Sequence, residues 1–294
     1  MYYFLAIIVC AIWGATFVSS KILLNAGLSP AMVFFLRFLL AYMVTVVVTL
    51  PLSFRKMWCD SRKDEITMLV AGMSGGSMYF LTENFALLYT QSAHVSFMTS
   101  LPPLFLVIFA VLRPGGSKGH WTIWLGMLLA VLGLVCFVLG ADPEAAPNPL
   151  LGIMIALVSA LLWCVYQVVV DPMSEKYGTL MVTRKVFGYG LLTILPFVVC
   201  EVPELPDRLV GCEVWFHLLF LGLLASLFCF YMWNVIIKKI GSVTSANFLY
   251  LNPFVTCVAS YFLLGEQIRF CMILGGAFTI AGVYLGLKNS DRNI

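Results

Sequence analysis

The sequence predicts an all-α membrane protein whose ten transmembrane helices form two inverted five-helix repeats. Three observations support this prediction: the composition, the distribution of basic residues, and a weak internal repeat. Of the 294 residues, 62% are hydrophobic and 11% are charged, and the mean hydropathy is +0.99. Soluble enzymes, nucleic-acid-binding proteins and disordered chains are excluded as first interpretations, because a soluble protein of this size cannot hide so much apolar surface.

Ten apolar segments are long enough to cross a bilayer, since a spanning helix needs about 20 residues. We expect spans at 2–24, 30–52, 65–88, 92–112, 120–140, 149–170, 180–200, 213–236, 243–263 and 269–287. The connections are short, and turn residues such as Gly27 to Pro30 and Asp142 to Pro149 mark them. The first segment is long and has no basic residue before it, so we expect a retained helix instead of a signal peptide.

Basic residues indicate which connections face the cytoplasm, where Lys and Arg accumulate. Of the 17 basic residues, 13 lie after spans 2, 4, 6 and 8 or in the C-terminal tail: Arg55, Lys56, Arg62, Lys63, Arg113, Lys118, Lys176, Arg184, Lys185, Lys238, Lys239, Lys288 and Arg292. The opposite connections contain only Arg208 and Arg269. The sequence therefore predicts a multi-pass protein of the cell (inner) membrane with both termini in the cytoplasm.

An internal repeat becomes visible when the chain is shifted by 150 residues. The shift superimposes rare residue types without a gap: Trp13 on Trp163, Asn84 on Asn234, Ser92 on Ser242, and Leu101-Pro102-Pro103 on Leu251-Asn252-Pro253. We expect two units, 1–147 and 148–294, each with five spans. An odd number of spans makes the second unit enter the membrane from the other side, an arrangement found in many secondary transporters with a substrate site near the midplane.

Several segments resemble EamA-type repeats of the drug/metabolite transporter superfamily. The similar segments are Ala11-Ile12-Trp13-Gly14, Leu36-Arg37-Phe38, residues 86–93, Leu249-Tyr250-Leu251-Asn252-Pro253, Leu264-Gly265-Glu266, and residues 274–283. The first half departs from the pattern, because Pro114-Gly115-Gly116 stands where Leu-Gly-Glu is expected, so no shared role follows for Glu266. The resemblance implies that spans 1, 3, 4, 6, 8 and 9 surround a central cavity. It also implies export or exchange of small metabolites or amphipathic compounds.

Ionisable residues within the spans are the first candidates for function, because such a group costs about 2.5–3.5 kcal/mol at the bilayer centre on insertion scales. Four of them fall in the outer third of four consecutive spans: Lys21, Arg37, Glu83 and His94. One interpretation is a gating or proton-coupling network at the outward mouth. The alternative is structural: a fixed pair of Glu83 with Arg37 or Lys21, a Lys21 that reaches the interface, and a hydrogen-bonded His94.

Prolines and aromatic or amide residues are the second set of candidates. Pro102, Pro103 and Pro253 are expected to kink spans 4 and 9, either as hinges beside the cavity or as simple packing kinks. The substrate-cavity candidates are Trp13, Phe17, Tyr79, Trp163, Tyr166, Gln167, Asn234, Asn247, Tyr250 and Asn252. Aromatic stripes also form ordinary packing surfaces, so about half of the aromatic and amide candidates are expected to touch the cavity.

The expected function is that of a secondary transporter which exports a small metabolite or amphipathic compound by alternating access. The sequence contains no G-x-x-x-x-G-K-[ST], H-E-x-x-H or G-x-S-x-G motif. We therefore expect no enzyme activity, cofactor, metal site or nucleic-acid partner, only a small-molecule substrate and membrane lipid. Two alternatives remain. One is a membrane-embedded enzyme, which the sequence disfavours because Glu83 is the single carboxylate inside a span. The other is a non-transporting scaffold, which is disfavoured because the loops are too short to form a recognition surface.

Overall fold

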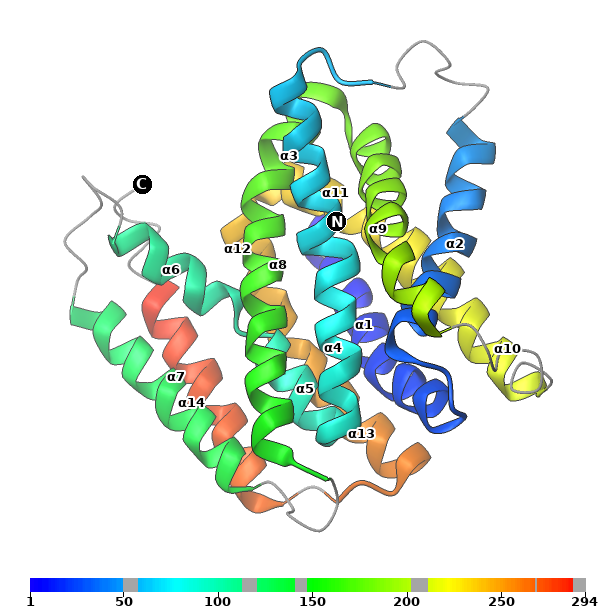
Figure 1. Ribbon diagram of the computed structural model, residues 1–294. Helices are drawn as coiled ribbons and strands as arrows, with labels where there is room; N and C mark the ends of the chain where they lie inside the picture. Colours follow the sequence, from blue (N-terminus) through cyan, green and yellow to red (C-terminus); the bar gives the residue numbers. More distant parts are fainter. Residues whose placement is uncertain (50–57, 113–120, 141–146, 202–210, 268, 288–294) are drawn as a thin grey trace.

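The structure, a computed structural model, describes residues 1–49, 58–112, 121–140, 147–201, 211–267 and 269–287 (Figure 1). These residues form ten helical segments and contain no strand. Six segments are continuous: α1 (Tyr2–Asn25), α2 (Pro30–Thr49), α7 (Trp121–Leu139), α8 (Pro149–Tyr177), α9 (Thr179–Glu201) and α14 (Phe270–Leu287). The all-α prediction is confirmed for this part of the chain.

The other four segments are interrupted. The third consists of α3 (Arg62–Gly72), the π-helical η1 (Met73–Ser77) and α4 (Met78–Tyr89), and the fourth of α5 (Ser92–Thr99) and α6 (Pro102–Leu112). The eighth consists of α10 (Cys212–Leu219), the π-helical η4 (Phe220–Phe228) and α11 (Cys229–Ile240). The ninth consists of α12 (Ser242–Ala246), the 3-10 helix η5 (Asn247–Leu251) and α13 (Asn252–Leu264).

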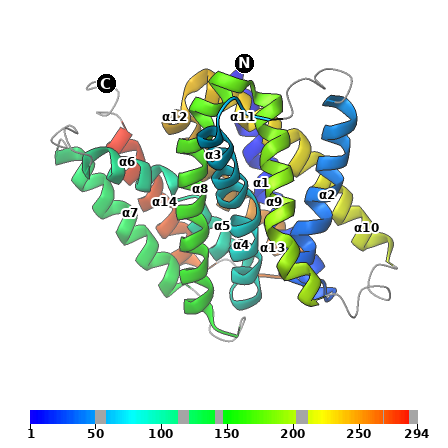
Figure 2. The same cartoon turned by 45° about the horizontal axis from the view of Figure 1, so that its top comes forward.

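Six of the helical segments are long and apolar enough to cross a membrane. They are Tyr2–Asn25, Pro30–Val48, Pro149–Tyr177, Thr179–Val199, Cys212–Ile240 and Thr244–Leu264, with mean hydropathies from 1.3 to 2.4. A helix of 20 residues is about 30 Å long, which matches the hydrocarbon core of a bilayer. The chain is therefore a multi-pass membrane protein, and the remaining segments run alongside these six (Figure 2).

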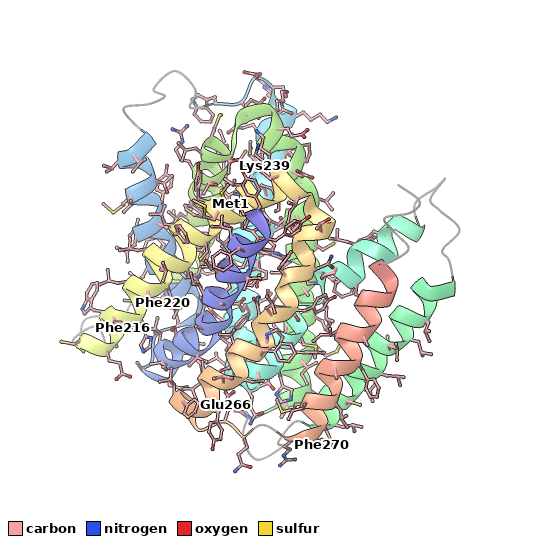
Figure 3. All side chains as sticks on the ribbon, turned by 180° about the vertical axis from the view of Figure 1, so that it is seen from behind. Met1, Phe216, Phe220, Lys239, Glu266 and Phe270 are labelled. Atoms are coloured by element: carbon pink, nitrogen blue, oxygen red, sulfur yellow. The ribbon has the colours of Figure 1, made fainter. Side chains whose placement is uncertain are left out.

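Basic residues gather at one end of the molecule, which we call the basic end. This end contains the starts of α3 and α9 and the ends of α8 and α11, with Arg62, Lys63, Lys176, Arg184, Lys185, Lys238 and Lys239. Met1 and Lys239 lie toward it, whereas Glu266 and Phe270 lie at the opposite end (Figure 3). The predicted loop residues Arg55, Lys56, Arg113, Pro114-Gly115-Gly116, Lys118, Arg208, Lys288 and Arg292 lie outside the described residues.

The helix interruptions in the two halves of the chain correspond at the 150-residue offset. The π-helical residues 73–77 fall on 223–227, which lie within the π-helical η4. The break between α5 and α6 at Ser100 and Leu101 falls on the last two residues of the 3-10 helix η5. Irregular helix turns of this kind are frequent at functional sites.

The three prolines expected to kink spans 4 and 9, Pro102, Pro103 and Pro253, lie where helices begin instead of inside continuous helices. Pro102 is the first residue of α6, and Pro253 lies in the first turn of α13. The first turn tolerates proline because its backbone nitrogens have no intrahelical acceptor. The expected kinks in spans 4 and 9 are thus junctions between two helical pieces.

The core is a layer of closely packed helices around α1, with α7 and α14 paired at one side of the bundle (Figure 1). Helices α1 and α13 cross at Gly14, where a Cβ atom would lie 2.8 Å from the backbone oxygen of Asn252. The Thr256 hydroxyl donates to the Gly14 carbonyl at 2.7 Å across the same crossing. The missing side chain therefore brings the first and the ninth helical segments into direct contact.

Candidate functional site

A small pocket lies at the centre of the bundle, where helices from both halves of the chain meet. Its lining residues are Trp13, Thr16, Phe17, Arg37, Tyr79, Phe80, Glu83, Thr99, Trp163, Phe230, Leu249 and Asn252, and we call it the central pocket. Its volume is about 20 Å³, which is room for about one water molecule. Seven of the residues expected from the sequence line it: Trp13, Phe17, Arg37, Tyr79, Glu83, Trp163 and Asn252.

Trp13 is the centre of the aromatic wall. Its ring meets the Trp163 ring edge-on at 5.5 Å between centroids and the Phe230 ring at 5.9 Å. Its indole nitrogen donates to the carbonyl oxygen of Ala225 at 3.1 Å. Because Ala225 belongs to η4, the irregular helix supplies the acceptor for the buried indole. The wall is held in one orientation by both ring contacts and this hydrogen bond.

Arg37 is completely buried, with 0% of its surface exposed. Its Nε atom donates to the Ser226 hydroxyl at 2.9 Å, and its guanidinium carbon lies 4.4 Å from the centroid of the Phe80 ring. The Nη1 atom has no hydrogen-bond partner among the described residues. An aromatic face stabilises a guanidinium group only partly, so this cation keeps an unused donor beside the pocket.

Glu83 lies on the same pocket and is 2% exposed. The hydroxyl of Tyr79, one helical turn earlier, hydrogen-bonds to its carboxylate. Within the described part of the chain, its Oε1 atom has no partner. Of the ion pairs between described residues, none joins Glu83 to Arg37. Two groups of opposite formal charge therefore face one pocket, and each keeps an unsatisfied atom, which is unfavourable in a purely structural pair.

The remaining charged candidates lie elsewhere. Lys21 lines a separate pocket of about 560 Å³ at the opposite end, together with Asn25, Gln91 and Glu266. Its ammonium group donates to the carbonyl oxygens of Leu87 and Thr90, at the end of α4. His94 is buried on α5 and is not among the residues that line the central pocket. The four residues expected at one depth are thus divided among at least two places.

The chain matches the family model described as "EamA-like transporter family" at residues 1–139 and 150–287. The chain belongs to the EamA-like transporter family. The resemblance noted in the sequence is thereby confirmed. Each half of the chain is therefore similar to the same family model.

Two relatives match this EamA-like chain over most of its length. An uncharacterized transporter of Archaeoglobus fulgidus is 26% identical over 93% of each chain. A protein of Streptantibioticus cattleyicolor named "Probable terminal-alkyne amino-acid exporter" is 25% identical over 93% of this chain and 89% of its own. A solved crystal structure matches with a TM-score of 0.67 and 18% identity over 99% of this chain and 98% of its own, which supports the fold.

Two of the amide and tyrosine candidates, Tyr166 and Asn234, form a polar cluster outside the central pocket. The Tyr166 hydroxyl donates to Asn234 Oδ1 at 2.6 Å, and Asn234 Nδ2 donates to the Thr183 hydroxyl at 2.9 Å. This cluster ties α8, α9 and α11 together. Gln167 is buried nearby on α8, and both of its amide atoms are without a partner among the described residues.

Four of the candidates lie along the ninth segment. Asn247 is half-buried on η5. Tyr250 and Pro253 line a different cavity, between α13 and α14. Asn252, between them, is thus the member of this group that lines the central pocket.

Sequence reasoning missed five residues of the central pocket: Thr16, Phe80, Thr99, Phe230 and Leu249. At the 150-residue offset, Phe80 corresponds to Phe230 and Thr99 corresponds to Leu249. With Trp13 and Trp163, three pairs related by this offset line one pocket. Across the described ranges, no group of three His, Cys, Asp or Glu side chains could hold a metal ion.

Proposed function

We propose that this protein is a secondary transporter that exports a small metabolite or amphipathic compound across the cell (inner) membrane by alternating access. The observation that carries the proposal is the central pocket, where buried Arg37 and Glu83 face an aromatic wall and keep unsatisfied atoms. Such a pocket suits a molecule with polar groups on an apolar body. The name of the Streptantibioticus relative supports export and a substrate of amino-acid type.

We further propose that residues 1–147 and 148–294 are inverted repeats which move relative to each other. The matching interruptions η1 and η4 support this arrangement, as do the offset pairs that line the pocket. The family model also matches each half separately. In an inverted repeat the pocket lies at the interface between the units, so rocking one unit exposes it to one side of the membrane at a time.

The size of the pocket supports an occluded conformation. A volume of about 20 Å³ is far below the range of about 300–1,000 Å³ for sites that bind small molecules. Substrate binding therefore requires helices to separate. The junctions at Pro102, Pro103 and Pro253 are the proposed hinges, because helix pieces joined by irregular turns can tilt without breaking regular hydrogen bonds.

Transport is favoured over the two alternatives. A membrane-embedded hydrolase needs a nucleophile with a base or paired carboxylates, and Glu83 is the single carboxylate among the described residues that line the central pocket. A scaffold needs no buried charges, because unpaired charges inside a bundle are unfavourable. We place the basic end in the cytoplasm, with both termini, on the strength of its Lys and Arg residues.

Flux measurements test the proposal. Cells that lack or overproduce the protein are first screened with amino acids and amphipathic compounds, and compounds whose cellular level falls on overproduction are then loaded into proteoliposomes. We expect flux with the wild type, little flux with Arg37→Met, and normal flux with the surface control Lys239→Met. Chemical conversion of the compound would indicate an enzyme, and binding without flux would indicate a scaffold; either result overturns the proposal.

A further inference from the structure

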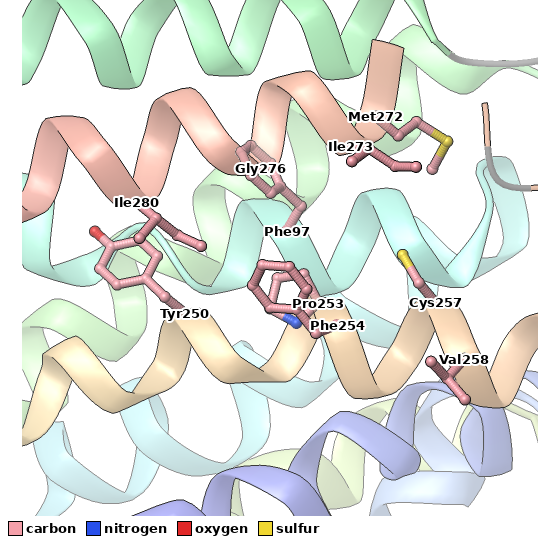
Figure 4. Close-up of a pocket in the computed structure, with 10 residues that line it drawn as sticks. All are labelled: Phe97, Tyr250, Pro253, Phe254, Cys257, Val258, Met272, Ile273, Gly276 and Ile280. Carbon is pink, nitrogen blue, oxygen red and sulfur yellow. The ribbon is translucent and has the colours of Figure 1, made fainter. Parts of the chain in front are cut away.

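A second cavity of about 330 Å³ lies between the ninth and tenth helical segments, and we call it the α13–α14 groove. Side chains from Tyr250 to Val258 face those from Met272 to Ile280, with Phe97 of α5 between them (Figure 4). The lining is apolar apart from the Tyr250 hydroxyl and the Cys257 thiol. Among the described residues, none lines both the central pocket and this groove.

The groove lies at the depth of the bilayer centre. Phe254 is the midpoint of the candidate span Thr244–Leu264. The groove also opens to the outside of the bundle, because Phe254, Val258 and Ile273 are 50%, 58% and 59% exposed. At this depth the surrounding medium is hydrocarbon, without water or lipid headgroups.

The depth and the lining together identify the occupant. Water does not fill an apolar cavity, because it needs two to four polar partners. A soluble polar metabolite has no partners here either. A flexible apolar chain gains dispersion contacts along both helices, and phospholipid tails are present at this depth in large excess.

Gly276 leaves the middle of the groove open. A Cβ atom at this position would meet no atom within 4 Å. This contrasts with Gly14, whose missing side chain is needed for the close approach of α1 and α13. The glycine at 276 thus provides space in the groove instead of a helix contact.

We propose that the α13–α14 groove is a binding site for one acyl chain of a membrane phospholipid. The chain lies between α13 and α14, over Gly276 and against Phe97, and fills the space that these helices leave. Adjacent residues of α13 face different cavities, since Asn252 lines the central pocket and Pro253 lines the groove. A bound chain therefore supports the wall of the central pocket from behind.

Photo-crosslinking tests this site without any knowledge of the transported substrate. The full chain is reconstituted with phosphatidylcholine that carries a diazirine in one acyl chain, irradiated, and mapped by mass spectrometry. We expect adducts on Phe254, Val258 and Ile273 at several times the level found on Leu150, Met154 and Val158. Those three residues of α8 are exposed to a similar degree and serve as an internal reference for ordinary lipid contact.

Two substitutions at neighbouring positions give a matched pair. Gly276→Phe fills the groove and should abolish the excess labelling, while the α8 adducts remain. Ala277→Phe adds the same bulk outside the groove lining and should change nothing. If Gly276→Phe fails to fold, Cys257→Leu reduces the same space from the α13 side.

Three results would overturn the proposal. The first is groove labelling no higher than on α8, and the second is excess labelling that survives a folded groove-filling variant. The third is labelling that rises as the protein is diluted in the bilayer, because this would show that a second copy of the chain occupies the groove at higher protein density. Since the assay needs no flux, a failed transport proposal leaves its outcome unaffected.

Discussion

Arg37 and Glu83 face the same buried pocket without forming an ion pair. Arg37 is held by the Ser226 hydroxyl and the Phe80 ring, and Glu83 by the Tyr79 hydroxyl. The two charges are thus positioned by neutral groups instead of by each other. An arrangement of this kind leaves both charges able to interact with a third group in the pocket.

Arg37→Lys tests whether the shape of the guanidinium group matters. An ammonium group cannot place a donor on Ser226 and also lie flat on Phe80. We expect a loss of stability of about 1.5–3 kcal/mol, typical of a hydrogen bond to a charged group, and loss of most flux. Thermal unfolding in detergent and proteoliposome flux measure the two effects.

Ser226→Ala is the matched control for Arg37→Lys. It removes the hydroxyl acceptor and keeps the guanidinium group, so the buried Nε–H loses its partner. We therefore expect a loss of stability of about 1–3 kcal/mol, with most of the flux retained. Equal flux in Arg37→Lys and the wild type would show that Arg37 acts only as a positive charge or only in packing.

Asn252→Ala separates substrate contact from structural support. Asn252 is buried beside the central pocket, and its Oδ1 atom has no partner among the described residues. Removing an unsatisfied buried polar atom should leave stability unchanged or slightly higher. We expect transport to fall several-fold while the melting temperature is kept. A lower melting temperature with normal flux per folded molecule would contradict a role in the pocket.

The helical segments could be predicted because each depends on local hydrophobicity. The expected span 30–52 corresponds to Pro30–Thr49, and the expected span 2–24 to Tyr2–Asn25. Span 6 was underestimated, because α8 continues through polar residues to Tyr177. Its end is set by Gly178 with a φ of +83°, a backbone signal that hydropathy does not contain.

The central pocket could be predicted only in part, because it depends on which helix faces meet. Trp13 and Trp163 were found as rare residues at the repeat offset. Phe80 and Phe230 have the same offset, but 23 phenylalanines in the chain make one such match uninformative. The separation of Lys21 from Glu83 also could not be predicted, because it reflects the helix-end carbonyls that Lys21 binds.

Asp64 links the start of α3 to the end of α8 at the basic end by hydrogen bonds and an ion pair. It accepts hydrogen bonds from Lys176 Nζ and the Tyr177 hydroxyl, each at 2.6 Å. The Lys176 contact, followed by that of Tyr177, lowers the pKa of Asp64 from 3.8 to about 2. A lowered folded-state pKa stabilises the fold above the unfolded pKa, and this contribution is lost as the pH falls through the folded value.

Asp64→Asn should therefore lower the melting temperature at neutral pH. The difference from the wild type should stay constant down to about pH 4 and shrink between about pH 4 and pH 2. Glu175→Gln, at an exposed position near the end of α8, is the charge-matched control and should change little. A difference that persists at the lowest pH would show that Asp64 acts through packing.

The topology can be checked with single cysteines in a cysteine-free background. Because basic residues mark the cytoplasmic side, we expect a cysteine at Ala145 to react with an impermeant maleimide in intact cells. A cysteine at Asp60 should react with the maleimide only after the membrane is permeabilised. The reverse pattern would place the basic end outside and contradict the proposed orientation.

Glu83→Gln tests whether the pocket carboxylate couples transport to protons. Glutamine has nearly the same volume and can still bind the Tyr79 hydroxyl, but it cannot gain or lose a charge. A carboxylate that exchanges a proton in each cycle would then be fixed in one form. We expect the variant to keep substrate exchange between equal pools and to lose accumulation driven by an imposed pH gradient. Flux is measured in proteoliposomes with and without the gradient and normalised to folded protein, with Tyr79→Phe as the control that keeps the carboxylate.

If Glu83 only locks helices together, the glutamine variant should instead unfold at lower temperature while flux per folded molecule stays normal. Undiminished pH-driven accumulation would remove Glu83 from the coupling mechanism. It would also place coupling outside a pocket carboxylate, because no other carboxylate lines the central pocket among the described residues.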